Sequence, residues 1–308
     1  MNIKILGSAA GGGFPQWNCN CPNCRDVRAE AQGLMARTQS SIAISTNGTD
    51  WLLVNASPDI LTQIRAHPEL QPARHARDTG IAAILLTDAQ LDHVTGLLML
   101  REHHRPWPVY TTLSVWDDLS GGFPVATLLG HYCGVQHHPL ALDGSPVQGL
   151  GFLDGVRITA VPLDSKAPPW SPSRTRSRLG DNIGLVIENT VSGKRVFYAP
   201  GLGDAGPEVR GHMQAADLLL VDGTLWSDDE MIQCGLSGKT ASDMGHLALS
   251  GPGGMIELLD SVGQERRVRK VLVHINNSNP VLRDGSPQRA VLQRHGIEVG
   301  FDGMSFRM

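Results

Sequence analysis

The sequence predicts a layered α+β fold in which two β-sheets pack face to face and helices flank them. Many apolar runs are short, rich in β-branched residues and bounded by Gly, Pro, Asp or Asn, which is typical of β-strands. Helical patterns are fewer and lie between groups of these runs. Because the strands come in groups and do not alternate strictly with helices, their order favours two sheets over one parallel sheet.

The individual elements follow from these patterns in chain order. The first strand, 3–6, runs into a tight turn with Gly at 11–13. The other expected strands are 41–45, 51–55, 82–86, 156–161, 182–188, 195–199, 217–221 and 271–275. Apolar residues recur at helical spacing in 59–66, 91–103, 254–260 and 287–295. No internal repeat or low-complexity segment divides the chain, so we expect a single domain over 1–308.

Composition argues against several classes of function. The 308 residues hold 26 Lys and Arg against 30 Asp and Glu, a net charge of −4, so no nucleic-acid partner is expected. No apolar window of about 18 residues occurs, so we expect no membrane span. The opening "MNIKILGS" lacks the basic head and apolar centre of a signal peptide. We therefore expect a cytoplasmic protein whose thiols stay reduced.

The segment "CNCPNC", at 19–24, is the strongest local motif. Three thiols at this spacing are typical of a zinc knuckle, because soft thiolates suit Zn²⁺ and close spacing wraps a tetrahedral ion. The alternatives are unrelated buried cysteines or a redox pair. A turn that contains Pro and Asn packs poorly without an ion to organise it. We therefore predict structural zinc on Cys19, Cys21 and Cys24, with a fourth ligand outside the motif.

His or Asp residues stand where three expected strands end. Asp92 and His93 follow one buried strand, His274 ends another in "VLVHINNSNP", and Asp204 follows a third in "FYAPGLGD". The carboxyl ends of strands commonly carry reactive groups. The alternative for the first pair is that Asp92 caps a helix and His93 lies on the surface. Two imidazoles and one carboxylate suit Fe(II) in a facial triad and also suit Zn²⁺, so composition leaves the metal open.

A long loop without regular structure is expected at 166–181, "KAPPWSPSRTRSRLGD". Its Pro and Ser residues oppose helix and strand, and loops of this length are usually functional or disordered. One interpretation is a solvated basic loop. The other is a clamp for carboxylate groups of a ligand, since guanidinium pairs them bidentately. The members of such a clamp would be Lys166, Arg174, Arg176 and Arg178.

The order of the motifs resembles the metallo-β-lactamase superfamily, in the branch that includes tRNase Z and the phosphonate-pathway phosphodiesterase. The motifs are "CNCPNC", "DAQLDH", "VPLD", "YAPGLGD", "ADLLLVDGT", "DMGH" and "VLVHINNSNP". The opening "GSAAGGGFPQWNCNCPNC", the "LDHVTGLLMLRE" helix and "HINNSNPVL" are similar to a family of pyrroloquinoline quinone (PQQ) biosynthesis proteins. The resemblance spans essentially the whole chain and implies an αββα sandwich of two mixed sheets flanked by helices.

Position by position, the resemblance implies one degraded and one intact metal site. In two-metal hydrolases the first ion takes histidines at places that here hold Asp88, Gln90 and Asp164. An incomplete two-metal clamp argues against phosphodiester or β-lactam hydrolysis. The ligand places of the second ion are filled by Asp92, His93, His274 and the shared aspartate Asp204.

Two further residues take supporting roles in the resemblance. His246 of "DMGH" stands where the fold supplies a histidine for proton transfer or for support of the ligands, although a lone His is more often structural. Asp222 ends a strand and is expected to orient a ligand histidine by a hydrogen bond.

For function, the resemblance implies an iron-dependent hydroxylase, an oxidoreductase that acts on the tyrosine ring of a Glu–Tyr-derived PQQ precursor. The expected cofactors are structural Zn²⁺ and active-site Fe²⁺, and the expected partners are O₂ and a small acidic substrate or PQQ itself. Contacts with other proteins of the PQQ pathway are a further expectation. Two alternatives stay open: a non-catalytic carrier for the transport of PQQ or its precursor, and a single-metal hydrolase.

Overall fold

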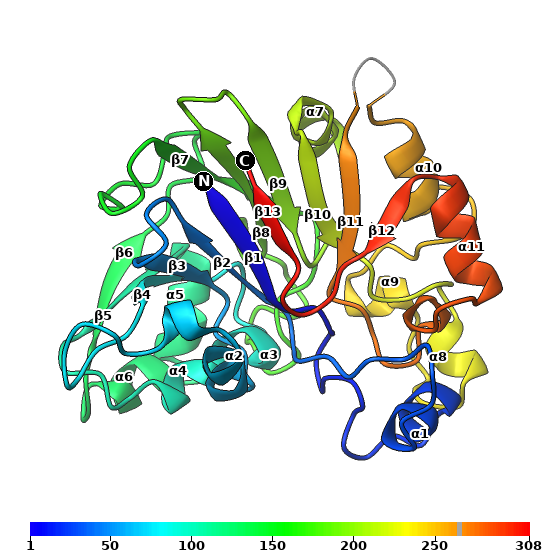
Figure 1. The fold of residues 1–308 in the computed structure, drawn as a ribbon, viewed down its shortest axis with the longest axis horizontal. Coiled ribbons are helices and arrows are strands. Elements are labelled where there is room, and N and C mark those ends of the chain that lie inside the picture. The colour runs from blue at the N-terminus through cyan, green and yellow to red at the C-terminus, as the bar shows by residue number, and fades with distance from the viewer. Residues whose placement is uncertain (264–266) are drawn as a thin grey trace.

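Two mixed β-sheets form the centre of the computed structural model, which describes residues 1–263 and 267–308 (Figure 1). The first sheet runs in the order β13 (Ser305–Arg307), β1 (Asn2–Gly7), β2 (Ser41–Ser45), β3 (Trp51–Val54), β4 (Ile81–Leu85), β5 (Trp107–Thr111) and β6 (Val135–Pro139). The second runs in the order β12 (Ile297–Val299), β11 (Arg269–Val273), β10 (Leu218–Asp222), β9 (Arg195–Ala199), β8 (Ile183–Asn189) and β7 (Val156–Pro162). Each sheet contains antiparallel and parallel pairs, for example β1 with β2 and β3 with β4.

Helices cover the outer face of each sheet. Apolar side chains of the first sheet pack against α2 (Ile60–Ala66), α3 (Leu91–Val94), α4 (Gly96–Met99), α5 (Leu113–Ser120) and α6 (Val125–Leu129). The second sheet packs against α7 (Pro207–Ala215), α10 (Met255–Asp260) and α11 (Pro287–Arg294). Shorter helices, α1 (Pro22–Arg28), α8 (Glu230–Gln233) and α9 (Ala241–Met244), lie in the same half of the molecule as α11 (Figure 1). The predicted αββα sandwich is therefore confirmed.

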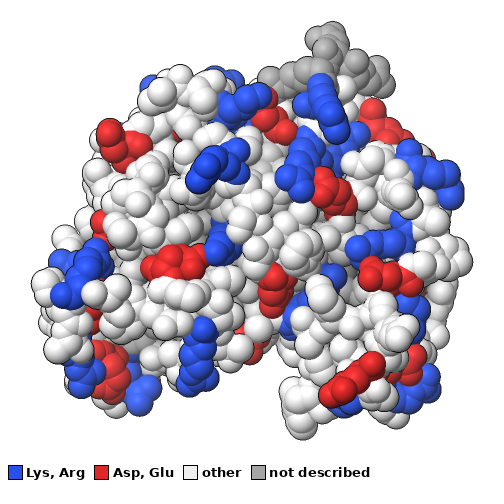
Figure 2. Space-filling model, viewed as in Figure 1, with Lys and Arg blue, Asp and Glu red and all other residues white. Residues whose placement is uncertain are grey.

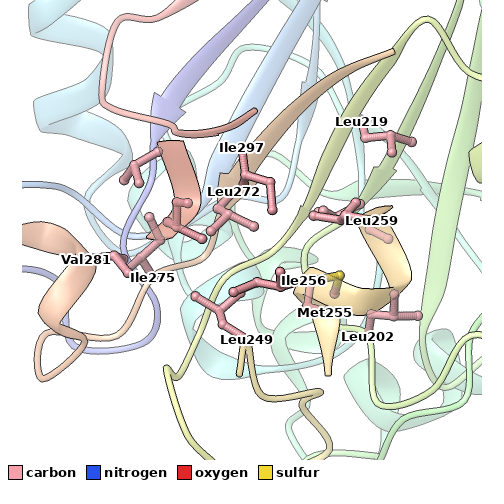
Figure 3. Close-up of a cluster of buried hydrophobic side chains, with 14 of the residues drawn as sticks. Leu202, Leu219, Leu249, Met255, Ile256, Leu259, Leu272, Ile275, Val281 and Ile297 are labelled. Carbon is pink, nitrogen blue, oxygen red and sulfur yellow. The ribbon is translucent and has the colours of Figure 1, made fainter. Parts of the chain in front are cut away.

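Strand β10 shows how the sequence specifies these layers. Leu218 and Leu220 belong to the core between the two sheets, whereas Leu219 and Val221 belong to the core under the helices. Successive side chains of a strand point to opposite faces, so a strand buried on both faces is apolar throughout. In Figure 3, Leu219 lies near Leu259 of α10 within the outer core.

The predicted strands are largely confirmed, with β2 and β9 at the predicted bounds. The predicted helix over 91–103 is wrong, because the structure has two short helices, α3 and α4, and the second ends at Met99. The Gly96 N–H donates to the carbonyl of Ala56 at 2.9 Å, and a Cβ on Gly96 would lie 2.2 Å from the Ser57 carbonyl oxygen. Gly96 thus packs directly on the backbone of Ala56 and Ser57, at the point where α3 ends and α4 begins.

The described surface mixes both signs of charge. Acidic and basic side chains are interspersed over the face shown in Figure 2. Some of them pair, as Arg269 does with Glu298 at 2.7 Å and Lys194 with Asp217 at 2.9 Å. Exposed pairs of this kind contribute about 0–1 kcal/mol each. No helix within the described residues is long and apolar enough to cross a membrane.

Candidate metal centre

Three of the four predicted metal ligands meet at the carboxyl ends of two strands, one in each sheet. After β4 the chain turns into α3, which carries Asp92 and His93. After β11 the next residue is His274. One ligand atom from each of these residues lies within 4.8 Å of the other two. His93 is 1% exposed, which rules out the alternative of an ordinary surface histidine.

The histidine rings are held through their Nδ1 atoms. Both carboxylate oxygens of Asp88 lie against Nδ1 of His93, at 2.9 and 2.8 Å. The hydroxyl oxygen of Thr224 lies 2.9 Å from Nδ1 of His274. A proton on Nδ1 that is donated to such an acceptor leaves the lone pair on Nε2. Nε2 of each ring is then the atom that can bind a metal.

The hydroxyl of Thr224 acts as an acceptor toward His274. Its single proton goes to an oxygen atom, because Asp222 Oδ1 lies 2.6 Å away and the His274 carbonyl 2.9 Å away. A hydroxyl has one proton to donate, so none remains for the imidazole. His274 must therefore donate from Nδ1.

His246 lies beside this cluster and pairs with Asp222. Its Nδ1 atom is 2.6 Å from Asp222 Oδ2, and its ring stacks on that of His274 with centroids 5.3 Å apart. Ligand atoms of Asp222, His246 and His274 form a second group within 4.8 Å of one another. Asp222 thus orients a histidine, as expected, but that histidine is His246.

Asp204 is not brought to the cluster. It belongs to neither of the histidine-containing groups found in the described residues. Its backbone pairs with Asp164, and its carboxylate accepts from the N–H of Ala205 at 2.7 Å. Asp204 therefore stabilises its own turn. The carboxylate that lies beside His246 and His274 is that of Asp222. Asp88, which stands at a ligand position of the degraded first metal site, gives both carboxylate oxygens to His93.

Burial and charge together favour a cation at this site. Burial alone would lower the pKa of His93, but Asp88 and Asp92 outweigh it and raise the pKa to about 9. Burial alone would raise the pKa of Asp92, but His93 and His274 outweigh it and hold that pKa below its usual range. The carboxylates therefore stabilise positive charge among the rings.

A second observation, the unpaired state of a buried nitrogen atom, also indicates a metal ion at Asp92, His93 and His274. His93 Nε2 is buried without a hydrogen-bond partner in the described part of the chain, and Asp92 Oδ2 lies 3.7 Å away. His274 Nε2 lies 3.2 Å from the same oxygen. A buried nitrogen without a partner is uncommon and calls for an explanation such as an ion. Two imidazoles and one carboxylate converging in this way match known metal-binding sets.

A pocket of about 350 Å³ opens over the cluster. Its buried end contains His93 and His274, and its lining also includes Gln90, Arg174 and Lys239. A larger cavity of about 1050 Å³ lies elsewhere, along β10, β11 and β13, and none of the metal-ligand groups of the described residues lines it. The chemistry therefore belongs to the smaller pocket.

The backbone at His274 is in an unusual conformation. Its φ is +56°, in the left-handed region that non-glycine residues seldom adopt. The Thr224 hydroxyl contacts the His274 carbonyl, and the next N–H, of Ile275, donates to the Ser8 carbonyl at 2.9 Å. Such a conformation costs about 1–3 kcal/mol and persists only where the surroundings fix it. It aims the ring toward Asp92.

The cysteine knuckle forms a second, separate cluster. Cys19, Cys21 and Cys24 are buried, and their sulfur atoms lie within 4.8 Å of one another. The side-chain amide nitrogen of Asn277 lies 3.0, 3.6 and 3.3 Å from these three sulfurs. Rotation of an amide by about 180° exchanges its nitrogen and oxygen, so Asn277 can present an oxygen to an ion there. Asn277 is therefore the candidate for the missing fourth ligand.

The basic loop contributes less to the pocket than the sequence suggested. Of the four predicted clamp residues only Arg174 lines it. Lys166 donates from Nζ to two carbonyls at the end of α9, at 2.9 and 3.0 Å. Arg178 pairs with Asp118 at 3.0 Å, and Arg176 is exposed. Lys166 and Arg178 therefore bind other segments of the protein and do not face the pocket.

Sequence reasoning missed Thr224 and Lys239. Thr224 stands two residues after Asp222, so the strand end that gave Asp222 was a signal for both. Lys239 stands four residues before Asp243, the first residue of "DMGH", and lines the same pocket as His246. The sequence signal for both residues was that each lies within a few residues of a recognised motif.

Comparisons with known proteins show the family of the chain. A model of the beta-lactamase superfamily domain matches residues 50–275. The coenzyme PQQ synthesis protein B of Cupriavidus necator is 58% identical over 307 residues, which cover 100% of this chain and 99% of that protein. The protein of the same name from Cupriavidus taiwanensis is 60% identical over 306 residues, with 99% of each chain covered.

Solved structures show the same relationship. The crystal structure of Zn²⁺-bound PqqB from Methylobacterium extorquens has a TM-score of 0.89 and 37% identity, with 100% of both chains covered. A diphosphatase of the PhnP family has a TM-score of 0.67 at 15% identity, covers 100% of this chain and 97% of that one, and shares the fold. The chain belongs to the coenzyme PQQ synthesis protein B family, within the beta-lactamase superfamily.

Proposed function

We propose that this PQQ biosynthesis protein is a non-haem iron oxygenase that hydroxylates the tyrosine ring of a small Glu–Tyr-derived precursor. The observation that carries the proposal is the ligand set Asp92, His93 and His274, one carboxylate and two imidazoles gathered within 4.8 Å. This composition is that of the facial triad used by Fe(II) oxygenases.

Asp92, His93 and His274 would hold the iron, and bound Fe(II) supplies the activation of O₂. Asp88 and Thr224 keep the two rings oriented by accepting from their Nδ1 atoms. Partners of this kind fix ligand tautomers and strengthen the ligands. The buried position of both histidines keeps bulk water from that end of the pocket.

His246 is the proposed proton carrier. Burial would lower its pKa, but the contact with Asp222 outweighs this and raises the pKa above its ordinary value. The Nδ1 atom is occupied by Asp222, so Nε2 is the atom that takes up or releases a proton. A histidine with a neighbouring carboxylate suits general acid–base work.

The geometry argues against two-metal hydrolysis. The places that carry histidines in two-metal relatives hold Asp88 and Gln90, and Asp88 gives both oxygens to His93. A clamp on the attacking and leaving oxygens needs two ions about 3.5–4 Å apart. Two alternative functions remain to be tested: a single-metal hydrolase and a carrier for PQQ or its precursor. The experiment below distinguishes them from the oxygenase.

Zinc has a separate proposed place. Cys19, Cys21 and Cys24 would bind structural Zn²⁺, supported by their thiols, which are free and mutually close. Thiolate zinc sites suit a reducing compartment, so we propose action in the cytoplasm, where other proteins of the PQQ pathway would supply the small acidic substrate.

The test is anaerobic reconstitution with Fe(II), exposure to O₂ with a Glu–Tyr dipeptide, and mass spectrometry of the product. With an added reductant such as ascorbate supplying two electrons, we expect the ring to gain one oxygen atom of O₂ while the other leaves as water, in the iron-loaded sample and not in a zinc-loaded one. His295→Ala is a matched control, since this surface histidine pairs with Asp260. Tight PQQ binding without O₂ consumption would support the carrier, and product formed without O₂ would support the hydrolase.

A further inference from the structure

We propose that Lys239, together with Arg174, binds the carboxylate groups of the substrate at the exposed end of the metal pocket. This inference rests on the proposed function, because it assigns the ligand groups recognised by the same pocket. The ligand class is an anion with several carboxylates and an aromatic ring. Both residues line the pocket that contains His93 and His274.

The backbone of Lys239 is held in place by the start of α9. The next residue, Thr240, caps the helix: its side chain accepts from the N–H of Asp243 at 3.1 Å, and Asp243 accepts from the N–H of Thr240 at 3.1 Å. A reciprocal capping box fixes the entry of the chain into a helix. Lys239 is therefore presented from a defined position and not from a free loop.

The side chain of Lys239 is not used by the protein framework. The backbone N–H of Lys239 donates to the Ser237 hydroxyl, but its ammonium group forms no ion pair or hydrogen bond with the described residues, although it is close enough to Asp243 to help lower the pKa of that carboxyl. Lys166 differs, because its Nζ already donates to the carbonyls of Ser242 and Asp243. Of the two lysines near α9, Lys239 is the one whose ammonium group is available to a ligand.

Arg174 faces the same pocket and keeps donors to spare. Its two terminal nitrogens donate to the carbonyls of Ala167 and Asp243. A guanidinium has five N–H donors, so these contacts fix its position and leave others for a carboxylate. Arg174 and Lys239 come from different segments and together give the pocket two cationic groups.

The acidic residues of the pocket do not neutralise these cations. Asp88 supports His93, and Asp92 lies against both His93 and His274. A metal ion held by the histidines would add further positive charge. Lys239 is exposed and Arg174 half-buried, whereas the two histidines are buried, so the pocket has a cationic outer end and a metal-binding inner end. A ligand whose carboxylates stay outside can then direct its ring inward.

The experiment measures binding of PQQ, a polycarboxylate, by titration calorimetry to the protein as isolated, with the same metal content confirmed for each variant. Lys239→Gln should weaken binding about tenfold or more, since hydrogen bonds to charged groups contribute about 1.5–3 kcal/mol. Lys239→Arg should restore most of the affinity. Lys194→Gln removes the same charge near the larger cavity, where Lys194 pairs with Asp217, and should bind like wild type.

Two further readouts separate charge recognition from a structural effect. The wild-type affinity should fall more steeply with ionic strength than that of Lys239→Gln, because a screened ion pair has been removed. Wild type should bind PQQ far more tightly than the ester that lacks the negative charges. In turnover, Lys239→Gln should raise KM about tenfold and leave kcat within about twofold, as expected for lost ground-state binding.

The outcomes distinguish this inference from the proposed function. Unchanged PQQ affinity in Lys239→Gln, or equal wild-type affinity for PQQ and its ester, would overturn the inference even if the iron protein hydroxylates its substrate. Weaker binding in Lys239→Gln from a protein that never consumes O₂ would uphold the carboxylate site and overturn the oxygenase.

Discussion

The histidine cluster and the cysteine knuckle are two potential metal sites built by opposite means. The histidine cluster lines a pocket of about 350 Å³, and one of its nitrogens, His93 Nε2, is buried without a partner in the described residues. The three knuckle sulfurs lie against the amide of Asn277, and their residues are not among those that line this pocket. A site that faces a pocket can bind substrate, whereas a closed site contributes stability.

One short segment serves both clusters. His274 reaches the histidine cluster and Asn277, three residues later, reaches the knuckle. The N–H of Asn276, which lies between them, donates to the Thr224 carbonyl at 3.0 Å, and Asn279, two residues after Asn277, donates from its side chain to the Gly223 carbonyl at 2.9 Å. These bonds fix the segment, so metal binding at the knuckle supports the position of His274. The two sites differ in chemistry but share their backbone.

The strongest test of this comparison is His274→Ala. Loss of one imidazole from three ligands should abolish iron binding and hydroxylation together, while knuckle zinc stays bound. Metal analysis and O₂ consumption measure the two effects. His274→Asn is the matched variant, because Asn tolerates the left-handed backbone and separates strain from ligand loss. Stoichiometric iron and a wild-type rate in either variant would contradict the assigned triad.

The converse test is Cys21→Ser at the closed site. Cys21 supplies a sulfur and also caps α1, where its side chain accepts from the N–H of Cys24. Zinc content should fall by one ion per chain, and the free energy of unfolding should fall by about 4 kcal/mol or more, because loss of a metal site is one of the few mechanisms behind the largest single-mutation effects. Calorimetry checks the stability. Cys133→Ser, at a half-buried thiol outside the cluster, is the control, and full zinc retention in Cys21→Ser would refute the knuckle.

A smaller effect is expected from Asp88→Asn. The carboxylate supports His93 and also accepts from the N–H of Gln90 at 2.8 Å, so the amide preserves size but removes charge. Loss of such a supporting group costs about 10–100-fold in metal affinity or activity. Iron titration and turnover measure it, with Gln90→Ala as a neighbour that should leave iron bound. Wild-type iron affinity in Asp88→Asn would show that His93 needs no carboxylate.

The sequence predicted those site residues that directly follow the end of a recognisable strand. Strand β4 is apolar throughout and β11 ends in the apolar run Val271–Val273, so the ends of both strands were visible, and the residues that follow them had to lie at a sheet edge. That placed Asp92, His93 and His274 together. Resemblance to a family supplied the fold that joined the two edges, and the comparisons confirm that family.

Other features depended on contacts between distant segments. The sequence could not show that Asp204 turns back to the N–H of Ala205 or that Arg178 pairs with Asp118. Strands β12 and β13 are three residues long, too short to display an alternating pattern. In each case a neighbour from elsewhere in the chain decides the structure.

Asn277→Ala should have the smallest effect of these variants. It tests whether Asn277 is the fourth zinc ligand of the knuckle. Its amide touches all three sulfurs, so removal takes away one candidate ligand but leaves the three thiolates that dominate binding. Zinc should remain bound but transfer to a competing chelator several-fold faster. The loss of stability should be smaller than in Cys21→Ser. Asn277→His offers an imidazole at the same place and should slow zinc release again. If Asn277→Ala releases zinc at the wild-type rate, three thiolates and a solvent molecule complete the site.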